Sequence, residues 1–179
     1  MTDKSLLIEG KAAVLTNSQG NIINNIDTDM IFHNRYLHIT DINAMGQYAL
    51  DNLEGWKDFA KRIKDEKWSL LVVGKNFGAG SSRQQAVDCF TALGIEAIIG
   101  ESFGAIYKRN AINAGTLLVE LQHFSPSSCK TGDELELDLE KGNLLNKTRG
   151  TEIPIKPLSR VQLDIYHAGD LFAYASKQK

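Results

Sequence analysis

The fold class of this chain is decided by the stretch Ser69-Leu70-Leu71-Val72-Val73-Gly74-Lys75-Asn76-Phe77-Gly78-Ala79-Gly80-Ser81-Ser82-Arg83. It begins with an apolar run that is typical of a strand buried on both faces of a sheet. Glycines follow at once, and residues 82–93 can be helical. Ligands collect at such strand–loop–helix junctions, because free N–H groups and the helix dipole favour an anion. We therefore expect a carboxylate or a phosphate to bind here.

The segments downstream continue this alternation. Their hydrophobic patterns predict strands over residues 95–99 and 116–121, with a helix over 102–113 between them. Together with 69–73 and 82–93 they make a β-α-β-α-β unit with short connections, which is typical of a parallel sheet. The sequence therefore predicts an α/β fold.

Patterns on either side of this unit predict further elements. They are a strand over 6–15, a turn over 17–21, amphipathic helices over 42–53 and 56–63 on either side of Gly55, a hairpin strand over 134–139 before a turn at Gly142-Asn143, and a last helix over 159–175 that Gly169 can interrupt. No internal repeat or long linker divides the chain, so we expect one domain over residues 1–179.

Composition excludes several classes of function. The chain has 179 residues, and its 20 Lys and Arg are scattered and nearly balanced by 22 Asp and Glu, so nucleic acid is not an expected partner. No apolar run approaches the roughly 20 residues that cross a bilayer, and residues 1–10 lack a basic leader pattern. We therefore expect a cytoplasmic protein that does not bind membranes.

The two cysteines, Cys89 and Cys129, lie 40 positions apart without Cys-x-x-Cys spacing. They are too few to hold an iron–sulfur cluster or a structural zinc from this chain alone. We expect both to be buried or idle thiols in a reducing compartment.

The glycine-rich loop matches neither standard phosphate motif. A dinucleotide fingerprint needs glycine where Arg83 stands, and the loop lacks the Gly-Lys-Ser or Gly-Lys-Thr of a P-loop. It offers two hydroxyls and a guanidinium instead. By spacing alone, Ser82 with Gln85, or Ser81 with Gln84, also fits a helix capping box, with Arg83 solvated in the first turn. A hydrolase triad has no support, because the loop is not Gly-x-Ser-x-Gly and no histidine is near in sequence.

A second polar segment, Asn25-Ile26-Asp27-Thr28-Asp29, places two carboxylates one residue apart. Taken alone, such a pair is more often explained by capped turns.

Three motifs together resemble a known family. Asn25 to Asp29, Lys75 to Arg83 and Ser102-Phe103-Gly104-Ala105-Ile106-Tyr107-Lys108-Arg109-Asn110-Ala111-Ile112-Asn113-Ala114-Gly115 resemble, in order and spacing, the small subunits of the 3-isopropylmalate dehydratase and homoaconitase branch of the aconitase superfamily. The resemblance spans about residues 6–121 and implies a swivelling β/β/α domain of the aconitase C-terminal type. It also implies a separate large subunit that carries a 4Fe-4S cluster, with no cofactor bound by this chain.

The resemblance implies roles for individual residues. Family members isomerise a hydroxy-di- or tricarboxylic acid by removing water and adding it back, with a cluster iron acting on the departing hydroxyl. Ser81 corresponds to the general base, and its anion would need the helix N-terminus, the loop amides and Arg83. Arg83 corresponds to a group that grips a substrate carboxylate, and Ser82 to one that shapes the loop and binds substrate. Asp29 matches an aspartate that orients or relays protons near the cluster, whereas Asp27 is less well supported.

Substrate choice in this family is implied to depend on the segment after Tyr36-Leu37. Here it reads His38, Ile39 and Thr40, which matches neither the Arg-Thr version that reads a carboxylate nor the Val-Tyr version that reads an isopropyl group. Ile39 could pack on an apolar branch, whereas His38 could hydrogen-bond, pair with a carboxylate if it is protonated, or be an exposed loop residue.

The glycine-rich loop also departs from the family pattern. Ala79 stands where Cys or another small residue is usual, and Gln84 and Gln85 stand where the family has Glu and a further polar residue. The missing glutamate removes a possible partner for Arg83.

Taken together, the motifs predict a small subunit of a heterodimeric or heterotetrameric hydro-lyase that is inactive alone. The resemblance favours 3-isopropylmalate dehydratase, of leucine biosynthesis. The alternatives are a homoaconitase-like or 2,3-dimethylmalate dehydratase-like small subunit, and a non-enzymatic module that binds a carboxylate and regulates a partner.

Overall fold

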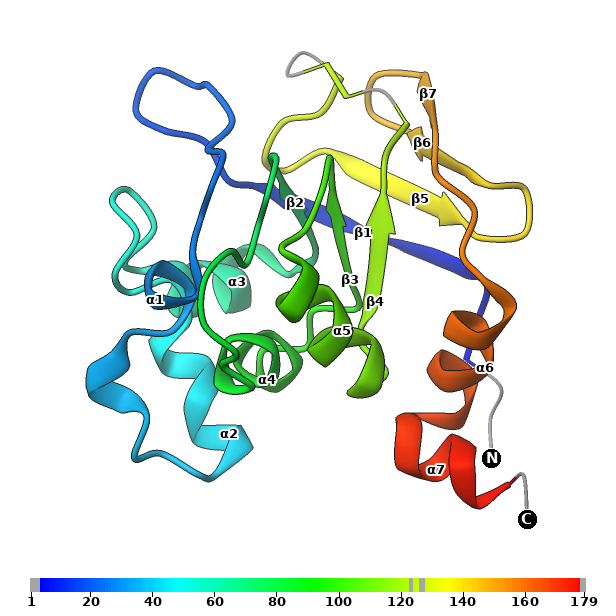
Figure 1. Cartoon of the computed structure of the whole chain (residues 1–179). Helices are drawn as coiled ribbons and strands as arrows, with labels where there is room; N and C mark the ends of the chain where they lie inside the picture. Colours follow the sequence, from blue (N-terminus) through cyan, green and yellow to red (C-terminus); the bar gives the residue numbers. More distant parts are fainter. Residues whose placement is uncertain (1–3, 123, 126–127, 178–179) are drawn as a thin grey trace.

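The computed structural model describes residues 4–122, 124–125 and 128–177 of the chain. The ends of the predicted domain, and the first residues of the 1–10 segment, therefore lie outside the described residues. In the described part, seven strands form one sheet in the order β4-β3-β2-β1-β5-β6-β7 (Figure 1). The strands are β1 Leu7–Val14, β2 Trp68–Val73, β3 Ala97–Gly100, β4 Leu117–Glu120, β5 Glu134–Asp138, β6 Asn143–Asn146 and β7 Thr151–Pro154.

The predicted β-α-β-α-β unit is confirmed. Strands β1 to β4 are parallel to one another. Helix α4 (Gln85–Ala92) joins β2 to β3, and α5 (Ala105–Asn113) joins β3 to β4. Successive side chains of β2 alternate between two cores, with Leu71 and Val73 in a cluster shared with the helices and Leu70 and Val72 in a cluster on the opposite face. A central strand can be continuously apolar because both of its faces are covered.

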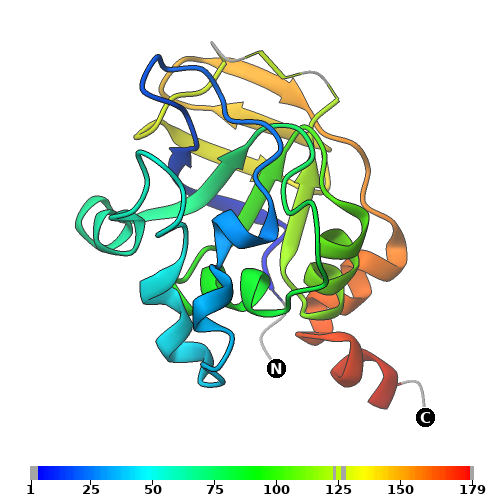
Figure 2. The same ribbon diagram turned by 60° about the vertical axis from the view of Figure 1, so that its left-hand side comes forward.

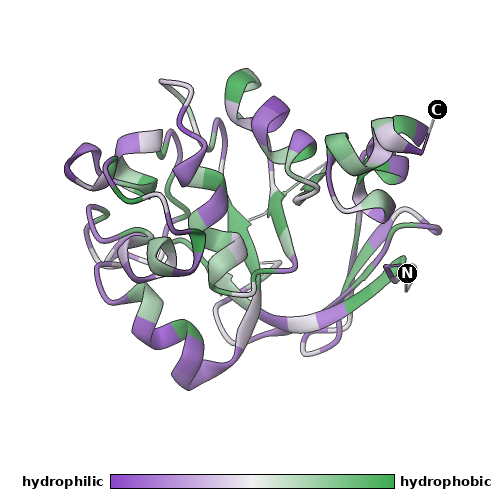
Figure 3. Cartoon of the chain, turned by 90° about the horizontal axis from the view of Figure 1, so that it is seen from below, coloured by the Kyte–Doolittle hydropathy of each residue, from purple (hydrophilic) through white to green (hydrophobic). Residues whose placement is uncertain are grey.

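The antiparallel strands β5, β6 and β7 cover that opposite face. Leu135, Leu137, Leu144 and Ile153 belong to the same buried cluster as Leu70 and Val72 of β2. The sheet therefore curls so that its antiparallel part packs on its parallel part, with helices on the remaining face, which confirms the expected β/β/α layering. Figure 3 shows the apolar strands near the centre of the molecule and the polar residues mostly in the outer loops and helical turns.

The predicted helix over 42–53 is wrong in its second half. The chain forms α2 (Ile42–Met45) and a 3-10 turn, η2 (Gly46–Tyr48), and then bends. Leu50 adopts a left-handed conformation (φ 60°), and its N–H donates to Ile31 O at 2.8 Å. This long-range bond replaces the helical bond that the local pattern predicts.

The remaining helices begin at capping residues or turns. They are α1 Thr28–Ile31, η1 Asn34–Tyr36, α3 Phe59–Glu66, α6 Arg160–Ala168 and α7 Leu171–Ser176. Helix α3 begins three residues later than the predicted helix over 56–63. Ser159 and Gln162 form a capping box at α6, and Gly169 (φ 106°) separates α6 from α7, so the interruption considered for the last helix is confirmed.

Both cysteines are buried thiols, as expected. Cys89 lies in the core shared with the helices and Cys129 in the core between the strand layers. Burial raises the pKa of the Cys129 thiol to about 12 and raises that of Cys89 further. In the part of the chain that the structure describes, no helix is long and apolar enough to span a membrane.

Candidate active site

The glycine-rich loop after β2 lies against the segment that leads into α1. Gly78 N donates to Ile26 O at 2.7 Å, and Thr28 N donates to Ala79 O at 2.9 Å. Figure 2 shows this segment (blue) in front of the loops that follow the parallel strands (green). Two motifs that are about 50 positions apart in the sequence therefore form one surface.

The third motif holds the loop from its other side. Ser102 Oγ accepts from Asn76 N at 2.9 Å, and Gly104 N donates to Phe77 O at 2.8 Å. Gly78 (φ 75°) crosses the ring of Tyr107 so closely that a Cβ on this residue would overlap the ring. Only glycine fits this crossing, both in backbone conformation and in space.

This crossing leaves the two serines on the surface. Ser81 is exposed, and its Oγ lies 3.2 Å from Thr28 Oγ1. Ser82 is also exposed, and its Oγ accepts from Asn110 Nδ2 at 3.3 Å. The capping-box alternative is wrong, because the residue that precedes α4 is Gln84 and its side chain caps nothing. The predicted helix over 82–93 therefore begins only at Gln85, and Ser81 does not lie at its first turn.

Arg83 points back toward α1. Its Nη1 donates to Thr28 O at 3.2 Å and to Phe32 O at 2.6 Å, and it pairs with Asp29 Oδ1 at 2.9 Å. The Arg83 side chain is only 12% exposed, so its interpretation as a solvated residue is wrong. Asp29 supplies the carboxylate partner that the loop lacks at Gln84.

The carboxylate of Asp29 is ionised and half-exposed. Partial burial raises its pKa, but the hydrogen bonds from Arg83 and Asn34 N and the charges of His33 and Arg83 outweigh that effect, so the net pKa lies below the usual value. Asp27 plays the structural part expected of a turn carboxylate. It caps α1 by accepting from Asp29 N at 2.9 Å and Met30 N at 2.8 Å.

The 36–40 segment forms a separate loop. Ile39 is half-buried against the helix-side core, whereas His38 and Thr40 are exposed. His38 Nδ1 lies 3.0 Å from Arg35 O. The loop contacts α4 through Gln85 Nε2, which donates to Leu37 O at 3.4 Å. The structure thus brings Ser81, Arg83 and Asp29 together and links the loop with His38 to the next helix.

Comparison with known proteins identifies the family. The model of the aconitase C-terminal domain matches residues 3–123. The 3-isopropylmalate dehydratase small subunit 1 of Archaeoglobus fulgidus is 41% identical over 84% of this chain and 89% of its own length. This chain belongs to the 3-isopropylmalate dehydratase small-subunit family. The small subunit of Caldicellulosiruptor bescii is 39% identical over 84% of the chain and 87% of its own length.

A solved structure supports the assignment to the small-subunit family. The crystal structure of 3-isopropylmalate dehydratase from Methanocaldococcus jannaschii superposes with a TM-score of 0.83 and is 31% identical. The match covers 96% of this chain and 95% of that one. The expected fold and family are therefore confirmed over nearly the whole chain.

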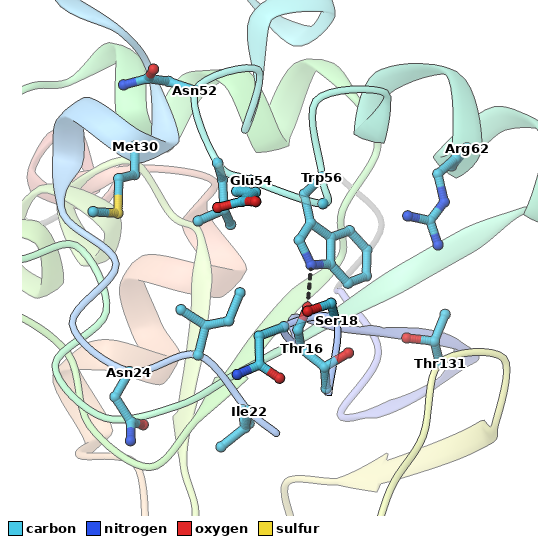
Figure 4. A pocket seen from close by; sticks show the side chains of 14 residues that line it. Thr16, Ser18, Ile22, Asn24, Met30, Asn52, Glu54, Trp56, Arg62 and Thr131 are labelled. Carbon is cyan, nitrogen blue, oxygen red and sulfur yellow. Dashed lines mark hydrogen bonds between the residues drawn. The ribbon is translucent and has the colours of Figure 1, made fainter. Parts of the chain in front are cut away.

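A cleft of about 980 Å³ opens beside this site but does not contain Ser81 or Arg83. Figure 4 shows it between the turn that follows β1 and the segment that precedes α3, with Trp56 Nε1 donating to Thr16 O at 2.9 Å. Asn52 lines the cleft, and its Nδ2 donates to Asp29 O at 3.3 Å. The cleft therefore adjoins the back of the Asp29–Arg83 pair, whereas the serines face the outer surface.

The described residues offer no ligand set for a metal cluster. Among them, no group of three or more His, Cys, Asp or Glu is close enough to hold a metal ion. Cys89 and Cys129 lie in two different cores on opposite faces of the parallel strands. No chemical step is therefore assigned to a metal held by this chain.

Sequence reasoning gave no role to Thr28 or Asn110. Both contact a serine of the loop from a distant part of the chain. Thr28 lies in the first family motif and Asn110 in the third. A hydroxyl or an amide at these positions is the sequence signal that could have identified them.

Proposed function

We propose that this chain is the small subunit of a 3-isopropylmalate dehydratase. It would supply proton-transfer and carboxylate-binding groups for the interconversion of 2-isopropylmalate and 3-isopropylmalate in leucine biosynthesis. The observation that carries the proposal is an exposed serine, Ser81, on a loop fixed from both sides by the other two family motifs.

In this proposal Ser81 acts on the C–H bond next to a substrate carboxylate. The deprotonated oxygen of Ser81 takes the proton, the electron pair of that bond forms the carbon–carbon double bond, and the hydroxyl on the neighbouring carbon leaves as hydroxide, which takes a second proton from solvent to become water. Readdition of water in the opposite sense returns the proton from Ser81 to carbon. General-base catalysis of this kind requires the oxygen to reach the substrate, which an exposed loop position allows.

Arg83 is the group we assign to a substrate carboxylate. Its hydrogen bonds to the described part of the chain all come from Nη1. The Nε and Nη2 edge would then receive the two oxygens of a carboxylate in the paired geometry that guanidinium favours. Asp29 fixes Arg83 from behind, and its proposed part in proton relay would use its second oxygen.

We propose that a large subunit completes the site and holds the 4Fe-4S cluster. The relatives are named as small subunits of a dehydratase, and Ser81 lies on an exposed face that a second chain can cover. His38, Ile39 and Thr40 would contact the side group of the substrate from the neighbouring loop.

The decisive experiment is Ser81→Ala in the complex reconstituted with the cognate large subunit. We expect normal assembly and a fall of about 10³-fold in kcat for 2-isopropylmalate, the scale typical of a lost proton-transfer group. Ser18→Ala, at another exposed serine, is the matched control and should leave kcat unchanged. Unchanged turnover in Ser81→Ala would remove Ser81 from the mechanism. The same assay with methyl-branched and tricarboxylic substrates tests the alternative members of the family.

A further inference from the structure

Thr28 is the buried residue on which the exposed Ser81 rests. Its exposed fraction is 3%, and its Oγ1 lies 3.2 Å from Ser81 Oγ. The backbone of Thr28 is fixed by the same loop, because its N–H donates to Ala79 O and its carbonyl accepts from Arg83 Nη1. The two hydroxyls are therefore held together by bonds on either side of Ser81.

The hydroxyl of Thr28 is not required to begin α1. The Asp27 carboxylate accepts from the first free N–H groups of that helix. In the described part of the chain, the side-chain hydrogen bond of Thr28 is the one to Ser81. Gly80 (φ 102°) supplies a backbone conformation between Ala79 and Ser81 that other residues rarely adopt, while a Cβ there would make only an ordinary contact, at 3.4 Å, with Thr28 Oγ1.

The direction of this hydrogen bond depends on the proton of Ser81. Between two neutral hydroxyls either oxygen can donate. When Ser81 has lost its proton, its oxygen can only accept, so Thr28 must be the donor. A hydrogen bond to a charged oxygen is about twice as strong as a neutral one and favours the charged form.

We infer that Thr28 is a positioning residue for Ser81, which donates a hydrogen bond to the deprotonated serine and so extends its action as a base to lower pH. This inference rests on the proposed role of Ser81 and adds the group that sets the pH at which it works.

The charged groups on the elements around Ser81 remain when the Thr28 hydroxyl is removed. They are Asp27 and Asp29 at α1, Arg83 in the loop, Asp88 on α4, and Lys108 and Arg109 on α5. A shifted pH profile in a variant at position 28 therefore reports the lost hydroxyl and not a lost charge.

The test is Thr28→Val in the reconstituted complex, compared with Thr28→Ser. Valine keeps the shape of the side chain and removes the donor, whereas serine keeps the donor. For Thr28→Val we expect kcat to fall about 10- to 100-fold and the rising limb of the kcat against pH profile to move up by about one unit, with KM within about twofold. Thr28→Ser should restore most of both values.

Two further variants separate the possible failures. If Thr28→Val does not assemble, Thr28→Ala lacks the same hydroxyl and receives the same pH measurement. A merely structural role predicts lower kcat with an unshifted pH profile, or equal losses in Thr28→Val and Thr28→Ser, and either result would overturn the inference. If Ser81→Ala is fully active, the proposed function fails first. If Ser81→Ala is inactive and Thr28→Val keeps the wild-type profile, only the role of Thr28 fails.

Discussion

The two loops that carry the candidate functional residues are built in opposite ways. Residues 77–83 are held by hydrogen bonds to α1 on one side and to Gly104 and Asn110 of the third motif on the other. Residues 36–40 are held at Tyr36, which donates to Asp51 Oδ2 at 2.5 Å and stacks on Tyr48, and by the packing of Ile39 on the core, while His38 and Thr40 project into solvent.

This difference separates two tasks. A base and a carboxylate grip need fixed geometry, because a small displacement of a reacting group costs much of the rate. A segment that reads the side group of the substrate can change residues without disturbing the fold if its side chains are exposed. The rigid loop is thus suited to the chemistry and the exposed loop to specificity, and variants in each should fail differently.

The largest expected effect on stability comes from Gly78→Ala, which changes the rigid loop itself. A Cβ at this position would overlap the ring of Tyr107. The alanine would also have to adopt the left-handed backbone conformation of Gly78 (φ 75°). We expect a loss of about 3 kcal/mol in the free energy of unfolding, from backbone strain and overpacking together. Gly20→Ala is the matched control, since it has φ 80° with nothing within 4 Å, and should lose only about 1 kcal/mol. Urea midpoints of the free chain measure both, and equal losses would contradict the tight crossing.

The next effect is expected for Arg83→Lys in the reconstituted enzyme. The lysine ammonium can pair with Asp29 in place of Arg83 Nη1. It lacks the Nε and Nη2 groups that are proposed to bind the substrate carboxylate. KM should therefore rise roughly 10- to 100-fold, the cost of about one charge-assisted hydrogen bond or two, with little change in stability. Arg35→Lys is the control from the other loop, because Arg35 is an exposed ion-pair partner of Asp51. Similar KM values for wild type and Arg83→Lys would exclude the carboxylate grip.

The parallel half of the fold could be predicted from the sequence because its signals are local. Residues 70–73 of strand β2 form a continuous apolar run, and the apolar residues of the helix that follows recur at helical spacing. Strand β7 was not predicted, because four residues with one buried side chain, Ile153, carry too short a pattern. The end of the 42–53 helix was missed because Leu50 bonds to Ile31 across the fold.

The site was predictable in its residues but not in their pairing. The motifs gave Ser81, Arg83 and Asp29 through resemblance, yet the capping-box alternative fitted the spacing equally well. The structure excludes the capping box, because Ser81 contacts Thr28 and Arg83 pairs with Asp29, 53 and 54 positions away in the sequence. Such pairs leave no periodic trace in the chain, so only the folded structure reveals that Asp29 is the partner of Arg83.

The smallest effect is expected for His38→Val, which changes the exposed loop and leaves the rigid one intact. His38 is exposed and its described ring contact is to Arg35 O, so stability and kcat for the best substrate should change little. An apolar side chain here favours an apolar branch by about tenfold, the low end of what one hydrophobic contact gives. The ratio of kcat/KM for 2-isopropylmalate and for a tricarboxylic homologue measures this preference. His38→Gln keeps a polar group at the same place and should keep the wild-type ratio. A ratio that stays constant in His38→Val as well would mean that this loop does not contact the side group, and that the division of tasks between the two loops is wrong.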